Sequence, residues 1–191
     1  MMKIEPKLPI KAVFVLAVLS LLASCGGNAE IDSKELEIRD NLAYEPGEDE
    51  PFTGISVSRF QDGTKYIEMH LVEGRRHGPS IKYWENGQKE EEENFENGKQ
   101  HGPYKTWYEN GQRRVEGNYV DGKRQGVWMG WHKDGKKSEE ETFVDGKLHG
   151  MQTRWHRNGK LHTQGNYVMS KRKGVHTEWN SKGEKTFEDS Y

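Results

Sequence analysis

The pattern of apolar and polar positions repeats every 24 residues over most of the chain. Large aromatic residues return at this interval in two columns of five. The first column consists of Tyr83, Trp107, Trp131, Trp155 and Trp179, and the second of Phe95, Tyr119, Phe143, Tyr167 and Tyr191. Glycines keep the same interval at Gly54, Gly78, Gly102, Gly126, Gly150 and Gly174. Self-similarity over six units indicates a repeat architecture, in which one structural unit recurs along the chain.

Two more glycine columns predict where each unit turns. One consists of Gly63, Gly87, Gly111, Gly135, Gly159 and Gly183, and the other of Gly74, Gly98, Gly122 and Gly146, with Ser170 in the fifth slot. Most of these glycines follow Asn or Asp. Asn-Gly and Asp-Gly favour tight type I′ turns, because both central residues need a positive φ that Gly adopts freely and Asn or Asp tolerates. We therefore expect these glycines to be structural turn residues.

The spacing of the turns leaves room only for strands. Turn glycines are separated alternately by 11 and 13 residues, which fits strands of about nine to eleven residues and no helix or crossover. The sequence therefore predicts an all-β fold, an extended single-layer antiparallel β-meander. It consists of about six 24-residue hairpin repeats that start at residues 54, 78, 102, 126, 150 and 174.

Equivalent residues of all repeats should point to one face of the sheet, because 24 is even and side chains alternate along a strand. Successive rings of one column are then about 9.6 Å apart, twice the strand spacing. Rings of neighbouring columns can interlock into a thin apolar layer, so each repeat is stabilised mainly by the next. The register stays open, since a bulged turn would move Trp107 to the other face.

Charged residues also form columns, which predict at least one solvated face. Acids occupy one column at Glu68, Glu92, Glu116, Glu140 and Glu188, and bases another at Lys65, Lys89, Arg113, Lys137 and Lys185. The final strand is charged as well, and such charges discourage edge-to-edge association. We therefore expect a monomer.

The N-terminal segment has the anatomy of an export signal. Three lysines precede an apolar run over 12–22, which is about half of the roughly 20 residues that a membrane-spanning helix needs. The segment Leu22–Cys25 resembles the lipobox of bacterial lipoproteins, whose Cys is acylated, and Cys25 is the only cysteine. We expect a lipoprotein signal peptide over 1–24 and lipid attachment at Cys25. An ordinary signal peptide with an incidental Cys is the alternative.

The residue after the cysteine bears on the destination. In the sorting rule for such lipoproteins an Asp at this position retains the protein at the inner membrane, and here the position holds Gly26. The resemblance therefore implies an outer-membrane lipoprotein of the cell envelope, facing either the periplasm or the exterior.

An acidic segment separates the leader from the repeats. Residues 26–51 hold nine acids and two bases, and such a charge excess extends a chain. We expect a tether over 25–33. Asp40-Asn41, flanked by alternating apolar residues, predicts a short hairpin within 34–51 that covers the first edge of the sheet. The repeat domain is thus expected over 34–191.

Composition narrows the classes of protein. The mean hydropathy of −1.07 and 31% hydrophobic residues are values typical of disorder, but 18 of the 20 aromatic residues lie in 52–191, where we expect order. With 29 Lys and Arg against 31 Asp and Glu, a strongly basic nucleic-acid binder is excluded. A single Cys excludes a disulfide scaffold.

Two recurring motifs resemble the MORN repeat variant family of bacteria. The motifs are aromatic-x-Asn-Gly-Gln and Asn-Gly-Lys-x-His-Gly, seen in Tyr83–Lys89, Asn97–Gly102 and Trp107–Gln112. The resemblance covers about residues 34–191 and weakens in the sixth unit, which has Asn180 in place of the aromatic residue. It implies an extended, twisted single-layer β-sheet used for binding. Many members carry the label of antitoxin components of toxin–antitoxin systems.

Catalytic or metal-binding chemistry finds little support in the sequence. His77, His101 and His149 precede glycines of the first column, but successive imidazoles about 9.6 Å apart, with no third ligand, do not suit zinc. We interpret them as turn-adjacent residues that bond a neighbouring carbonyl. The repeats also offer no phosphate-binding loop or nucleophile–base set. We expect no enzyme activity, no cofactor and no metal.

Binding is therefore the expected function, with no nucleic acid as partner. The first hypothesis is a non-enzymatic outer-envelope lipoprotein that acts as a protein-interaction or scaffolding module for an unidentified envelope protein. Its candidate binding face consists of Tyr83, Trp107, Trp131, Trp155 and Trp179. The alternative is a cell-wall or surface-glycan binder whose rings stack on sugars. An antitoxin-like role is third, because an exported chain leaves the cytoplasm where such toxins usually act.

Overall fold

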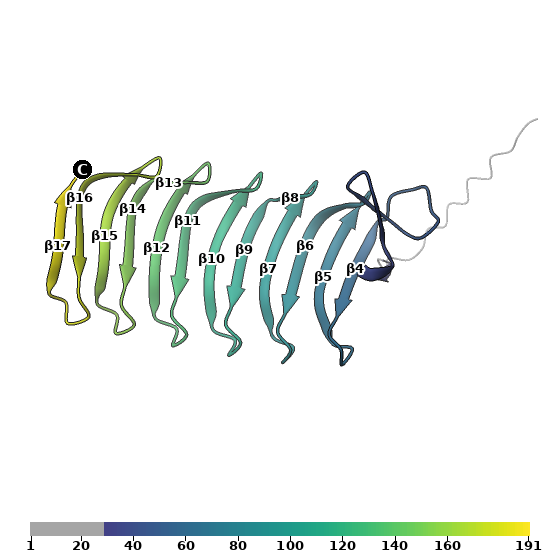
Figure 1. Ribbon diagram of the computed structural model, residues 1–191, viewed down its shortest axis with the longest axis horizontal. Helices are drawn as coiled ribbons and strands as arrows, with labels where there is room; N and C mark the ends of the chain where they lie inside the picture. The colour runs from purple at the N-terminus through teal and green to yellow at the C-terminus, as the bar shows by residue number, and fades with distance from the viewer. Residues whose placement is uncertain (1–28) are drawn as a thin grey trace, which may run out of the picture.

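A computed structural model describes residues 29–191, which form one long β-sheet and a separate two-stranded hairpin (Figure 1). The leader and Cys25 lie outside these residues. Among the residues described, no helix is long and apolar enough to cross a membrane. A short 3₁₀ helix, η1, covers Ser33–Glu35. The strands are β1 (Glu30–Asp32), β2 (Glu37–Arg39), β3 (Leu42–Tyr44), β4 (Gly54–Arg59), β5 (Lys65–Val72), β6 (Arg75–Tyr83), β7 (Lys89–Glu96), β8 (Lys99–Gln100), β9 (Gly102–Trp107), β10 (Arg113–Val120), β11 (Lys123–Trp131), β12 (Lys137–Val144), β13 (Lys147–Leu148), β14 (Gly150–Trp155), β15 (Leu161–Val168), β16 (Lys171–Trp179) and β17 (Lys185–Ser190).

The predicted all-β meander is confirmed. Fifteen strands belong to the sheet, and from β4 to β17 neighbours follow chain order and pair antiparallel. Each 24-residue unit supplies one hairpin, such as β9–β10 and β11–β12. In two units the first strand is interrupted, at His101 between β8 and β9 and at His149 between β13 and β14. The repeat therefore sets the topology, as the even spacing of the turn signals predicts.

The turns at one end of the sheet are the tight hairpins that the sequence predicts. Asn97 and Gly98 have φ values of 49° and 82°, as a type I′ turn requires. Where the glycine is missing, Met169 and Ser170 adopt φ values of 50° and 67°. The hydrogen-bonded network of the sheet thus imposes the same turn on residues that adopt it at a cost.

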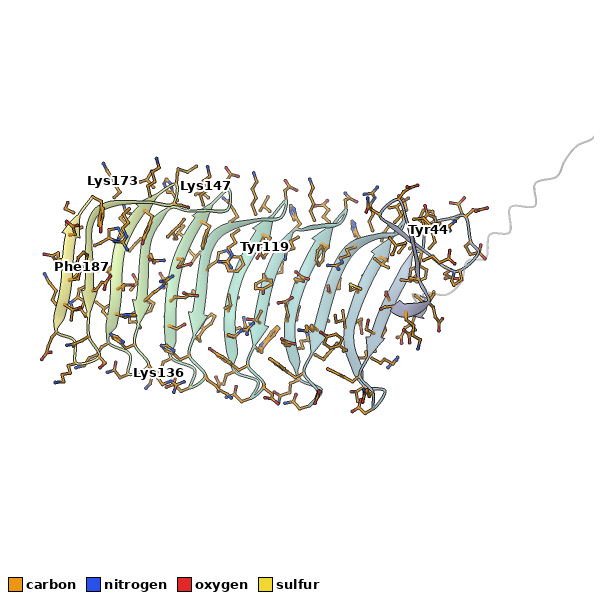
Figure 2. All side chains as sticks on the ribbon, viewed as in Figure 1. Tyr44, Tyr119, Lys136, Lys147, Lys173 and Phe187 are labelled. Carbon is orange, nitrogen blue, oxygen red and sulfur yellow. The ribbon has the colours of Figure 1, made fainter. Side chains whose placement is uncertain are left out.

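The loops at the opposite end of the sheet, one of which carries Lys136 in Figure 2, differ from the predicted type I′ turn. Only Gly has a positive φ there, 80° at Gly87, and the backbone N–H of Trp84 donates to the carbonyl of Gln88 at 2.8 Å. Asn86 keeps a negative φ, and its Oδ1 accepts the N–H of Gln88 at 3.0 Å. The prediction was wrong because the Asn side chain satisfies a loop donor itself. The structure places the six glycines Gly63, Gly87, Gly111, Gly135, Gly159 and Gly183 in these loops with positive φ.

The first glycine column marks an irregularity near the two-residue turns. Between β10 and β11, Glu116 pairs with Met129 but Asn118 pairs with Gln125, so β11 has two extra residues. Gly126 lies within this bulge with a φ of 73°, a conformation that costs Gly least. The strands bend at the corresponding level in Figure 1.

Alternation along the strands divides the side chains between two faces. On β9, Tyr104 lies on one face, here called the core face, and Trp107 lies on the other, here called the Trp face. Tyr119 pairs with Gly102, five positions from Trp107, and this odd number puts Tyr119 on the core face. The two aromatic columns therefore lie on opposite faces and do not interlock with each other.

The core face carries the aromatic packing of the middle repeats. The ring centroids of Tyr119 and Trp128 are 5.0 Å apart, those of Tyr104 and Trp128 5.4 Å, and those of Trp128 and Phe143 6.2 Å. Trp128 is only 3% exposed, because it lies over Gly117, where a Cβ atom would come within 2.2 Å of the indole. Ring packing of this kind stabilises a sheet that has no globular core.

The N-terminal residues depart from the expected boundary at residue 34. Glu30–Asp32, expected in the tether, form β1, which pairs in parallel with β4. The predicted hairpin forms as β2 and β3, with positive φ at Asp40 and Asn41. It does not cover the sheet edge but packs on the core face, where Ala43 joins a buried cluster with Phe52 and Leu71.

Candidate binding surfaces of the sheet

The candidate binding residues form one row on the Trp face, one ring per repeat. Each is half-buried and lies where its strand meets a loop. Four of the rings face a basic residue of the next strand, and one faces a leucine. These pairs are Tyr83 with Lys89, Trp107 with Arg113, Trp131 with Lys137, Trp179 with Lys185, and Trp155 with Leu161. The structure thus brings all five predicted residues onto one surface.

Cations lie over some of these rings. The Lys89 ammonium is 6.0 Å and the Arg113 guanidinium 5.4 Å from the ring centroid of Trp107, and Lys137 is 5.8 Å from that of Trp155. Such cation–π contacts contribute about 0.5–1 kcal/mol at exposed sites. They also occupy ring faces that would otherwise be open to a ligand.

The charged columns of the Trp face form a ladder of ion pairs. In five repeats the base bonds the acid three residues on, for example Lys89 with Glu92 at 2.6 Å and Lys137 with Glu140 at 2.8 Å. A bulge after the base puts both side chains on one face. In the fifth repeat Leu161 and Gln164 replace both partners. Acid and base therefore change together, which makes this stretch of the row the least charged.

A further column of rings, here called the loop column, connects neighbouring loops and was not predicted from the sequence. Trp84, Tyr108, His132 and His156 follow the row residues directly, and each ring bonds the backbone carbonyl of the next row residue. The distances are 3.3 Å for Trp84 to Trp107, 2.8 Å for Tyr108 to Trp131, 3.0 Å for His132 to Trp155 and 2.8 Å for His156 to Trp179. The 24-residue interval of these rings was the available signal. The loop of each repeat thereby fixes the backbone of the next ring in the row.

Carboxylates on the core face are held by donors and do not form a catalytic group. Glu141 is buried and accepts hydrogen bonds from Gln152 at 2.5 Å and Arg154 at 3.1 Å. Burial raises the pKa of Glu93 above its ordinary value, although Gln100 donates to it at 2.7 Å. These groups lie in a packed surface and face partners in neighbouring strands, which is a structural arrangement.

The histidines differ from their predicted role. The Nδ1 atoms of His101 and His149 are buried and have no hydrogen-bond partner, so the predicted ring contact with a carbonyl is wrong for these atoms. Their backbone N–H groups bond the carbonyls of Asn94 and Thr142 instead. Within residues 29–191, no group of three His, Cys, Asp or Glu residues could hold a metal ion.

The fold and these surfaces define a β-repeat protein whose sheet presents one face with packed rings and one with a row of half-buried rings. Residues 76–97, 100–121 and 148–169 match the model of the MORN repeat variant family. The three segments are in phase with the 24-residue unit, so three of the chain's repeats match the MORN repeat variant. No curated protein matches the chain. MORN repeats are non-catalytic modules that generally mediate interactions with proteins or membranes.

Proposed function

We propose that this protein is a non-enzymatic outer-membrane lipoprotein that binds another envelope protein through the Trp face. The anchor is Cys25, which follows a segment that resembles a lipobox, and Gly26 at the sorting position favours the outer membrane. The MORN repeats support a scaffold role, since a repeat sheet presents a long, regular surface. In this proposal a single copy of the chain, a monomer, binds the partner protein.

The row of rings on the Trp face carries the proposal. Five large side chains lie in one line, each half-buried, with basic residues beside four of them. Aromatic residues and Arg are enriched where protein interfaces have their strongest contacts. Because the loop column fixes the backbone of the row, the rings are held in place before a partner arrives, which lowers the entropy cost of binding.

The cations over the rings favour a protein over a glycan. A sugar needs an open ring face for stacking, whereas Lys89 and Arg113 lie over Trp107 and Lys137 lies over Trp155. A partner protein can instead contact ring edges and use its own acids for the cations. Glycan binding is therefore the second candidate. An antitoxin-like role rests only on labels in the family and is opposed by the leader.

A pull-down from the native outer membrane tests the proposal. The double variant Trp107→Ala/Trp131→Ala removes two rings of the row, and Lys123→Ala/Lys147→Ala serves as control because both lysines are exposed at the two-residue turns. Circular dichroism checks that both variants fold. We expect a stoichiometric protein with the wild type and the control but not with the Trp variant. Recovery of wall polymer or polysaccharide in place of a protein would support the glycan alternative.

A further inference from the structure

A pocket of about 500 Å³ lies between the N-terminal hairpin and the core face of the first two repeats. Its apolar lining includes Met69 and Leu71 from the sheet and Leu36 and Ile38 from the hairpin side. Ile38 is 69% exposed, a high value for a large aliphatic side chain. The volume falls within the range of small-molecule sites, about 300–1,000 Å³.

Three cationic residues, Arg75, Arg76 and Lys99, line this pocket, and its lining contains no Asp or Glu. Strand pairing puts Arg76, opposite Leu71, on the core face, whereas Arg75, opposite Val72, and Lys99, opposite Glu96, are on the other face of the sheet. In the part of the chain that the structure describes, none of the three forms an ion pair within 4.0 Å. The Arg76 guanidinium lies 5.1 Å from the ring centroid of Phe95. Its positive charge acts to lower the pKa of the Glu93 carboxyl, against the larger effect of burial. The pocket therefore combines an aliphatic interior with an excess of positive charge.

The space exists because small residues occupy the first two repeats. The column that holds Tyr104 and Trp128 in the third and fourth repeats holds Ser56 and Ser80 in the first and second. Near the start of β11, Arg124, the equivalent of Arg76, lies 4.3 Å from the ring centroid of Trp128. The volume that rings fill further along the sheet is thus open beneath the hairpin.

We propose that this pocket binds an amphipathic anion, with an unbranched alkyl chain on the aliphatic residues of the lining and a carboxylate or phosphate at the Arg76 guanidinium, where Arg75 and Lys99 add positive charge nearby. The apolar part of the lining is aliphatic and contains no aromatic ring, which suits a flexible chain more than a planar ligand. Guanidinium groups bind carboxylate and phosphate through paired hydrogen bonds. The site lies on the core face and is independent of the Trp face.

Calorimetric titration of the purified protein tests the proposal. The probes are dodecanoate, dodecyl phosphate, uncharged dodecyl maltoside and acetate, each below its critical micelle concentration where one exists. We expect one dodecanoate or dodecyl phosphate per chain, at least tenfold weaker binding of the maltoside, and no measurable binding of acetate. Tighter binding of dodecanoate would indicate a free fatty acid as the ligand, and tighter binding of dodecyl phosphate would indicate a lipid phosphate. Equal binding of the uncharged detergent would overturn the proposal.

Matched variants locate the site. Arg76→Gln should weaken binding of the anion about tenfold, the loss that removal of one charge-assisted contact produces, whereas Arg124→Gln at the equivalent position should not. Ile38→Asp should weaken binding, and Val127→Asp, at an exposed strand position, should not. Equal effects of both members of a pair, or no effect of either, would place the ligand elsewhere. Trp107→Ala/Trp131→Ala should leave the affinity unchanged, so this test and that of the proposed function fail separately.

Discussion

At the residue scale, the core face depends on glycines that the repeat alone does not explain. Gly117 and Gly165 lie outside the three glycine columns, and each lies under a ring, Trp128 and His176 respectively. The sequence shows the columns, but the contact of Gly117 with Trp128 depends on the bulge at Gly126. For this reason the row on the Trp face could be predicted from spacing, whereas the aromatic cluster of the core face could not.

Replacing Gly117 by Ala tests this packing. The added methyl group would lie 2.2 Å from the Trp128 ring, and overpacking of this kind costs about 1–3 kcal/mol. Urea unfolding should show that loss in the free energy of unfolding. Val120→Ala at an exposed position of the same strand is the control and should change little. A Gly117→Ala variant as stable as the control would contradict the packing.

The pH dependence of stability tests the burial of Glu93. Because burial raises its pKa from the ordinary value of 4.5, the folded state holds the proton more tightly than the unfolded state. The stability that comes from this group is complete below pH 4.5 and is lost as the pH rises through the raised pKa. Compared with the wild type, Glu93→Gln should therefore have a higher free energy of unfolding at pH 7, and this gain should be smaller or absent at pH 4. Urea unfolding at both pH values measures the difference.

Glu188→Gln is the opposite control for this measurement. Lys185 and Thr177 donate to Glu188 and lower its pKa, so its contribution is present above the ordinary value and is lost as the pH falls. The variant should lose stability at pH 7 and none at low pH. If Glu93→Gln behaves in the same way, the carboxyl of Glu93 is solvated in the folded state.

At the scale of elements, the sequence predicted the strands well and the loops in part. Positive φ at Asp40, Asn41 and Gly98 follows from the Asn-Gly and Asp-Asn signals. The five-residue loops were not predicted, because Asn86 and its equivalents use their side chains as loop acceptors. β1 was missed as well, since the three residues Glu30–Asp32 are too few for alternation to give a signal.

The turn at Met169 allows a stabilising substitution. Met169 has a φ of 50°, in the left-handed region that costs an ordinary residue roughly 1–2 kcal/mol and that Asn tolerates better. Met169→Asn should raise the free energy of unfolding by roughly 0.5–1 kcal/mol, as part of that cost is relieved. Met151→Asn, at an exposed position within β14, should bring no gain. An unchanged midpoint for Met169→Asn in urea would show that the turn is not under strain.

At the scale of the whole molecule, hydrogen bonds between turns hold neighbouring repeats together. The N–H of the second turn residue donates to a carbonyl 22 residues earlier at every two-residue turn of the sheet described. These bonds are Gly74 to Phe52, Gly98 to Arg76, Gly122 to Gln100, Gly146 to Arg124 and Ser170 to Leu148. Contacts therefore run between nearest neighbours, which makes the sheet a continuous scaffold with two accessible faces.

The proposed anchor gives a prediction of location. Cys25→Ala removes the thiol that the lipobox resemblance assigns to acylation, and stable membrane attachment of such a chain depends on its lipid. The wild type should sediment with outer membranes and incorporate labelled palmitate, whereas Cys25→Ala should do neither. Ser24→Ala, adjacent to the thiol, is the control and should remain attached. Equal sedimentation of Cys25→Ala and the wild type would contradict a lipid anchor.

Site-specific photocrosslinking in cells tests the central claim most directly. A photoreactive amino acid at Lys105 lies on the Trp face, and one at Arg114 lies on the core face, next to Thr106. The proposed function predicts a discrete protein adduct from position 105 that is absent from position 114 and lost in the Trp107→Ala/Trp131→Ala background. An adduct from position 114 alone, or equal adducts from both positions, would show that the Trp face is not the contact surface.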